Sequence, residues 1–227
     1  MSSDDVRTAG HEARREAAPF AAMIFVANVA LALVSRRAGW QLFGSNDWWI
    51  WLVISAPSAL LVATFWIGPG RMGLQERRRE VAIGLLALLG LGTAAGIVCV
   101  VVTLAHWRPG GLQLLASAAV VLFTNVLTFG LVFWELDDDG PVARRLATSR
   151  EHPDFQFPQD ENPELARPGW APALLDYVYL SVTNSIAFSP TDAMPLTHWA
   201  KLLMGLEAAV SALTVLIVAA RAINVMG

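Results

Sequence analysis

Residues 81–105 read VAIGLLALLGLGTAAGIVCVVVTLA, a run of apolar and small residues without a charged side chain. A helix needs about 20 consecutive apolar residues to cross the hydrocarbon core of a bilayer. Because lipid offers no partner to unsatisfied backbone groups, such a run has to be helical. The stretch predicts a membrane-spanning helix and makes the chain an integral membrane protein whose direct partner is the lipid bilayer.

Similar apolar runs lie on both sides of this stretch. The turn WRPGG at 107–111 separates it from the next run and predicts an antiparallel helical hairpin. Upstream, three closely spaced tryptophans resemble the aromatic belt found at membrane interfaces. Spanning helices are therefore expected at about 19–34, 48–67, 81–105 and 112–134.

The composition of the chain agrees with a membrane protein and argues against several other classes. Of 227 residues, 55% are hydrophobic and 15% are charged, against roughly 25% charged residues in soluble domains. The net charge of −3 and the absence of a long basic block exclude nucleic acid as a partner. The four histidines lack metal-ligand spacing, Cys99 is the sole cysteine, and no catalytic motif is found. We expect no metal, no cofactor and no enzymatic activity.

The charged and proline-rich residues divide the chain into four parts. The last part opens with 170–188, which is apolar but carries several hydroxyl and amide side chains, so it either spans the bilayer or re-enters it. The expected fold is an all-α transmembrane bundle with five or six membrane segments. The parts are a polar N-terminal segment 1–17, a four-helix transmembrane region 18–134, an acidic, proline-rich extramembrane linker 135–169 expected to be partly disordered, and a C-terminal module 170–227.

Basic residues predict the orientation of the bundle. Only Arg36, Arg37, Arg108 and either Lys201 or Arg221 fall on the side opposite the N-terminus, so twelve of the sixteen lysines and arginines share the N-terminal side. Cytoplasmic loops carry an excess of such residues. We expect an uncleaved first span, a cytoplasmic N-terminus and a location in the plasma (inner) membrane.

The C-terminal sequence DYVYLSVTNSIAFSPTDAMPLTHWAKLLMGLEAAVSALTVLIVAARAIN, residues 176–224, resembles the pore helix, filter and inner helix of potassium channels. The whole chain is also similar to a group of multi-pass bacterial membrane proteins that share this pattern and have no assigned activity. The matching positions are Tyr179, Ser181 and Thr183 on the pore-helix side and Asp192, Pro195, Thr197, Ala200 and Lys201 beyond it.

The resemblance implies a homo-oligomer, a tetramer in that family, with a constriction that could pass monovalent cations. The sequence SIAFSPT at 185–191 contains no glycine, so a potassium-selective carbonyl filter is not implied. The pore and constriction candidates are Thr183, Asn184, Ser185, Ile186, Ala187, Phe188, Ser189 and Asp192.

A polar stripe runs along the last apolar helix. Glu207, Ser211, Thr214 and Arg221 share one face at helical spacing. A carboxylate inside an apolar helix is costly in hydrocarbon and has to face protein or water. The stripe either lines an ion path or holds the bundle together by hydrogen bonds.

These observations leave three functions open. The leading hypothesis is a homo-oligomeric, channel-like ion-conducting protein. The alternative is a non-conducting structural or interaction protein of the membrane. A proton-coupled transporter that uses Glu207 is the third, and it lacks the visible repeats of many transporters.

Overall fold

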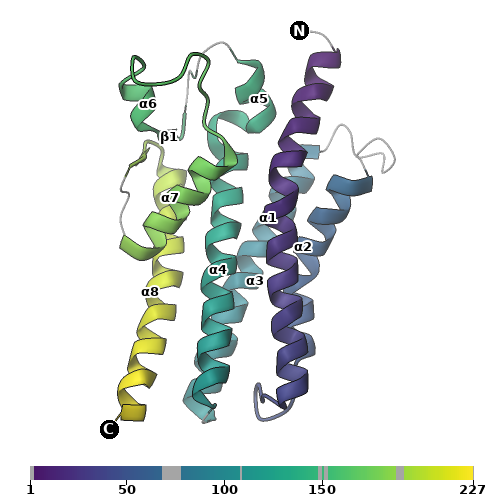
Figure 1. The fold of residues 1–227 in the computed structure, drawn as a ribbon, viewed down its shortest axis with the longest axis vertical. Helices are drawn as coiled ribbons and strands as arrows, with labels where there is room; N and C mark the ends of the chain where they lie inside the picture. Colours follow the sequence, from purple (N-terminus) through teal and green to yellow (C-terminus); the bar gives the residue numbers. More distant parts are fainter. Residues whose placement is uncertain are drawn as a thin grey trace.

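The computed structural model describes residues 3–67, 78–107, 109–147, 150, 153–187 and 192–226, with the backbone alone for 65–67, 78 and 220–226. The described residues form an all-α bundle with one two-stranded β-ladder (Figure 1). The long helices are α1 (Ser3–Ala38), α2 (Trp49–Ile67), α3 (Arg78–His106), α4 (Gly111–Leu136) and α8 (His198–Met226). The shorter elements are η1 (Asp137–Asp139), α5 (Pro141–Leu146), β1 (Phe155–Gln156), α6 (Pro158–Glu161), α7 (Leu174–Ala187) and β2 (Met194–Pro195).

Four of the described helices are long and apolar enough to cross a membrane, namely Asp4–Ala38, Arg79–His106, Gly111–Asp139 and His198–Ala219. The described part of α2, Trp49–Thr64, is apolar but shorter. These helices confirm the all-α class and indicate a membrane-embedded protein. The helix expected at 19–34 is longer than predicted at both ends. It begins at Ser3, within the polar segment 1–17, and ends at Ala38.

Helix α4 occupies the centre of the bundle. It packs against α1, α3, α7 and α8, and α2 joins α1 to α3 (Figure 1). The buried residues of α4 include both apolar side chains, such as Phe129 and Phe133, and polar ones, such as Asn125 and Thr128. A helix buried on several sides can place polar groups against more than one neighbour, and α4 does so against α7 and α8.

The acidic segment 135–169 has a defined structure in its described residues, 135–147, 150 and 153–169. Together with β2 it forms a cap on the end of the bundle where the N-terminus lies, opposite the C-terminus (Figure 1). The linker contains aromatic residues that can be buried, and Phe155 and Phe157 pack against Tyr177 of α7. Buried aromatic side chains and paired charges stabilise an ordered structure in this segment. Its acidic composition alone indicates neither feature.

The segment after the cap turns back inside the bundle. Helix α7 has 14 residues, about 21 Å at 1.5 Å per residue, which is short of the roughly 30 Å core of a bilayer. Beyond it, β2 pairs antiparallel with β1, with Phe155 opposite Pro195 and Gln156 opposite Met194. The chain therefore returns to the cap before α8 begins.

Candidate functional site

Glu207 lies near the middle of the apolar part of α8, nine residues after its first residue, His198. Its side chain is 0% exposed and faces α7 of the same chain. Ser211 is equally enclosed, and Thr214 is 4% exposed. Glu207, Ser211 and Thr214 of the polar stripe therefore point into the bundle, while other faces of α8 carry exposed apolar side chains such as Leu206 and Leu216.

Three side chains of α7 contact the Glu207 carboxyl group. Ser185 Oγ lies 3.0 Å from Oε1, and Asn184 Nδ2 donates to Oε2 at 2.7 Å. Ser181 Oγ forms a further hydrogen bond with Oε1. Because Ser181, Asn184 and Ser185 are spaced three and four residues apart, they share one helical face and converge on one group.

The contacts continue from α7 to α8 and α4. Ser211 Oγ lies 3.0 Å from Ser185 Oγ, and Asn125 Nδ2 donates to Ser211 Oγ at 3.0 Å. On the other side of the carboxyl group, Ser181 Oγ donates to the carbonyl oxygen of Val126 at 2.8 Å. The buried polar groups of α4, α7 and α8 thus form one continuous hydrogen-bonded cluster, which we call the Glu207 cluster: Asn125, Val126, Ser181, Asn184, Ser185, Glu207 and Ser211.

No charged partner balances Glu207 among the residues that the structure describes. None of the ion pairs found there includes it, and the side chains within hydrogen-bond distance of it are neutral. A buried carboxylate without a counter-charge loses far more hydration energy than three neutral hydrogen bonds return. The cluster is consequently a place where a positively charged ion, a proton included, would be stabilised.

The other candidate residues do not join this cluster. Thr183 and Thr214 donate to carbonyl groups of their own helices, at 2.9 Å and 2.8 Å respectively. Ile186, Ala187 and Asp192 are exposed. Phe188 and Ser189 lie outside the described residues, and Arg221 is described by its backbone alone.

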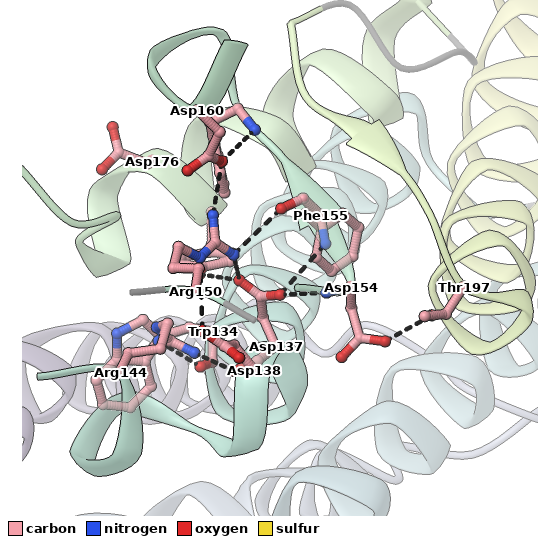
Figure 2. A network of polar contacts seen from close by, with 12 residues as sticks. Trp134, Asp137, Asp138, Arg144, Arg150, Asp154, Phe155, Asp160, Asp176 and Thr197 are labelled. Carbon is pink, nitrogen blue, oxygen red and sulfur yellow. Dashed lines mark hydrogen bonds and ion pairs between the residues drawn. The ribbon is translucent and has the colours of Figure 1, made fainter. Parts of the chain in front are cut away.

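A second polar network fastens the cap to the bundle around Asp137, which is 0% exposed (Figure 2). Arg150 pairs with its Oδ2 at 2.5 Å, and the hydroxyl of Tyr177 donates to the same oxygen. The backbone N–H groups of Asp154 and Phe155 donate to Oδ1 at 2.7 and 3.2 Å. Asp137 thereby joins the end of α4, the strand β1 and the start of α7.

Arg144 of α5 completes the cap by closing the C-terminal end of α4. Its guanidinium donates to the carbonyl oxygens of Trp134, at 2.7 Å, and of Asp137 (Figure 2). It also lies over the ring of Tyr177, 5.0 Å from the ring centroid. Burial lowers the pKa of Arg144, although neighbouring negative charge opposes the effect. Cations at a helix C-terminus satisfy its free carbonyl groups and its dipole.

The cap also forms hydrogen bonds with the two residues that precede α8, Leu196 and Thr197. Asp154 accepts a hydrogen bond from Thr197 Oγ1 at 2.6 Å, and its carbonyl accepts from Leu196 N at 2.8 Å (Figure 2). At the start of α7, Asp176 accepts a hydrogen bond from the backbone N–H of Ala173 at 2.8 Å and so caps the first turn of the helix. Burial raises the pKa of Asp176.

Several of these residues were not among the candidates from the sequence. Asn125 was visible as a polar residue in an apolar run but gave no indication of its partner. Ser181 was noted only for its match to a pore helix. Asp137 was one of three consecutive aspartates, and nothing in the sequence distinguishes the buried one from its neighbours.

Comparisons of the chain with models of protein families, with curated proteins and with solved structures gave no match.

Proposed function

We propose that the protein is a non-enzymatic membrane protein that moves protons or small monovalent cations along a path inside each subunit, with Glu207 as the ion-binding group. The observation that carries this proposal is the buried carboxyl group of Glu207, which has three neutral hydrogen-bond partners and no charged one among the described residues. Ionisable residues inside a membrane are rare, and they commonly mark substrate, ion or proton pathways.

The proposed ion path runs through the interior of one subunit and not through the centre of an oligomer. A central pore lined by Glu207, Ser211 and Thr214 needs these side chains to be reachable from water, whereas they are 0–4% exposed within a single chain. The face of α8 that another subunit could meet is apolar, with Leu202, Leu206 and Leu216 at 53–65% exposure. A tetramer resembling potassium channels is compatible with this proposal but is not needed for it.

The orientation in the proposal places the cap and the N-terminus in the cytoplasm, with the bundle in the plasma membrane. Support comes from the basic residues at the cap end, because Arg144, Arg145 and Arg150 belong to the cap and the basic residues of early α1 lie at the same end. Arg36 and Arg37 lie at the other end of α1. Helix α7 would then enter the bilayer from the cytoplasmic side.

Ion flux into liposomes tests the proposal. Purified protein reconstituted with a pH-sensitive or cation-sensitive dye inside the vesicles should dissipate an imposed proton, sodium or potassium gradient. Glu207→Gln should abolish this flux, whereas Glu161→Gln, at an exposed position of α6, should leave it unchanged. Full flux in Glu207→Gln, or none in the wild type under any of the three gradients, would overturn the proposal.

The second candidate is a non-conducting bundle in which the Glu207 cluster joins α4, α7 and α8. The observation that favours it is the complete burial of Glu207 and Ser211, since hydrogen-bonded polar side chains hold membrane helices together. A wild-type protein that is folded in liposomes and passes no ion would support this candidate.

A further inference from the structure

The hydrogen bonds around Ser181 constrain the number of protons in the Glu207 cluster. A serine hydroxyl has one hydrogen to donate and lone pairs to accept with. Ser181 Oγ contacts two oxygens, the carbonyl of Val126 at 2.8 Å and Oε1 of Glu207. A carbonyl oxygen can only accept, so the hydrogen of Ser181 lies between Ser181 and Val126. The hydrogen in the contact with Glu207 then has to come from Glu207.

We infer that Glu207 carries a bound proton on Oε1 and donates it to Ser181, so that the cluster is a proton-binding site in the interior of the bundle. The inference deepens the proposed function by naming its ion as a proton, and it rests on that function only for the use of the proton in transport.

With that proton in place, the hydroxyl groups of the cluster form a hydrogen-bonded chain that runs in one direction. Asn125 donates to Ser211, Ser211 to Ser185, and Ser185 to Oε1 of Glu207. Glu207 then donates to Ser181, which donates to the carbonyl of Val126. Each hydroxyl in this chain gives one hydrogen bond and accepts one. If Glu207 were ionised, the single hydrogen of Ser181 could point to Oε1 of Glu207 or to the carbonyl of Val126, and the other of these two oxygen–oxygen contacts would have no hydrogen between its atoms.

The directions of these hydrogen bonds also argue against a metal cation as the ion bound in the cluster. A cation is held by oxygen lone pairs, whereas Ser185 and Asn184 direct their hydrogens toward the carboxyl group. These groups would have to turn away before sodium or potassium could bind. A proton needs no such rearrangement, because Ser181 already offers a lone pair to it.

The surroundings of Glu207 also favour the neutral acid. The groups that contact it belong to α7, and the groups of α4 in the cluster are the Asn125 amide and the Val126 carbonyl. None of these is charged or titratable. A carboxyl group enclosed without a counter-charge takes up a proton instead of carrying its charge into a low-dielectric interior.

Infrared spectroscopy of the detergent-solubilised or reconstituted full chain tests this inference. At neutral pH, the wild type should show the carbonyl stretch of a protonated carboxylic acid, and this band should disappear in Glu207→Gln while the carboxylate bands stay unchanged. Glu161→Gln should instead lose carboxylate intensity and keep the acid band. If Glu207→Gln loses carboxylate intensity and no acid band, Glu207 is ionised and the inference is wrong.

A second measurement does not depend on a variant that has to fold. Labelling the side-chain carboxyl carbon of glutamate with ¹³C should shift the acid band of the wild type, because Glu207 gives rise to it. An acid band that does not shift, or no acid band, would overturn the inference. Absence of proton flux in liposomes counts against the proposed function alone, since the band is read from the protein at rest.

Discussion

Gly130 of α4 lies directly against the backbone of Val178 in α7. A Cβ atom added at Gly130 would be 2.8 Å from Cγ2 and 3.0 Å from Cα of Val178. Contacts this close to a main-chain atom cannot be relieved by a rotamer change. The absence of a side chain at Gly130 therefore sets how closely α7 approaches α4, and it brings Ser181 within reach of the carbonyl of Val126.

Gly130→Ala should destabilise the protein, because the new methyl group would push α7 away from α4. Overpacking of this kind costs roughly 1–3 kcal/mol. Gly90→Ala in α3 is the matched control, since a Cβ there would meet nothing within 4 Å, and alanine favours helix by up to about 1 kcal/mol. Denaturant unfolding in detergent, followed by tryptophan fluorescence, compares the two variants. Equal stability of both would show that the close approach is not required.

Asp137→Asn should weaken the cap, because it removes the charge that Arg150 and two backbone N–H groups share. Breaking a buried ion pair costs about 3–5 kcal/mol, and we expect the lower end because Asp160 still pairs with Arg150 at 2.7 Å. Asp139→Asn removes an exposed pair with Arg79 and should change stability by less than about 1 kcal/mol. Limited proteolysis of 135–169 provides a local measurement. Similar cleavage in both variants would contradict the role given to Asp137.

Arg144→Lys should also destabilise the cap although it keeps the charge. A lysine ammonium cannot donate to the Trp134 and Asp137 carbonyls while lying flat over Tyr177 as the guanidinium does. Losing one hydrogen bond from a charged donor costs about 1.5–3 kcal/mol. Arg79→Lys, at a half-exposed position, should have little effect. The measurement is the thermal unfolding temperature of the two variants. An Arg144→Lys variant as stable as the wild type would show that a positive charge at this position is enough to stabilise the cap.

Single cysteines in a Cys99→Ala background should report opposite sides of the membrane. Leu165 in the cap is 81% exposed and Leu112 at the start of α4 is 74% exposed. A membrane-impermeant thiol reagent should label Leu165→Cys from the cytoplasm and Leu112→Cys from outside. Labelling of both from one side would refute the arrangement of the helices relative to the bilayer.

Ser211→Cys in the same background should resist the reagent from either side. Ser211 is enclosed by α4 and α7 and is 0% exposed. Leu165→Cys serves as the positive control in the same vesicles. Rapid labelling of Ser211→Cys in folded protein would contradict this prediction and would support a water-filled path along α8.

The long apolar helices could be predicted from the sequence because the bilayer demands a length and a composition that are visible residue by residue. The polar face of α8 was predictable for the same reason, since Glu207 and Ser211 are conspicuous in an apolar run. Their partners were not, because Asn125 and Ser181 come from helices whose rotation depends on packing such as that at Gly130. The fold of the cap was hidden because composition does not tell a buried aspartate, Asp137, from an exposed one, Asp139.

The order of α7 and α8 along the chain constrains how this half of the molecule can assemble. The side chains of Ser185 and Asn184 find their partner, Glu207, on a helix that leaves the ribosome more than twenty residues later. The hydrogen bonds of α7 in the Glu207 cluster therefore cannot form until this part of α8 has been synthesised. Assembly of this half of the molecule is therefore a late step of synthesis, and a chain that stops before Glu207 leaves Ser181, Asn184 and Ser185 without their shared partner.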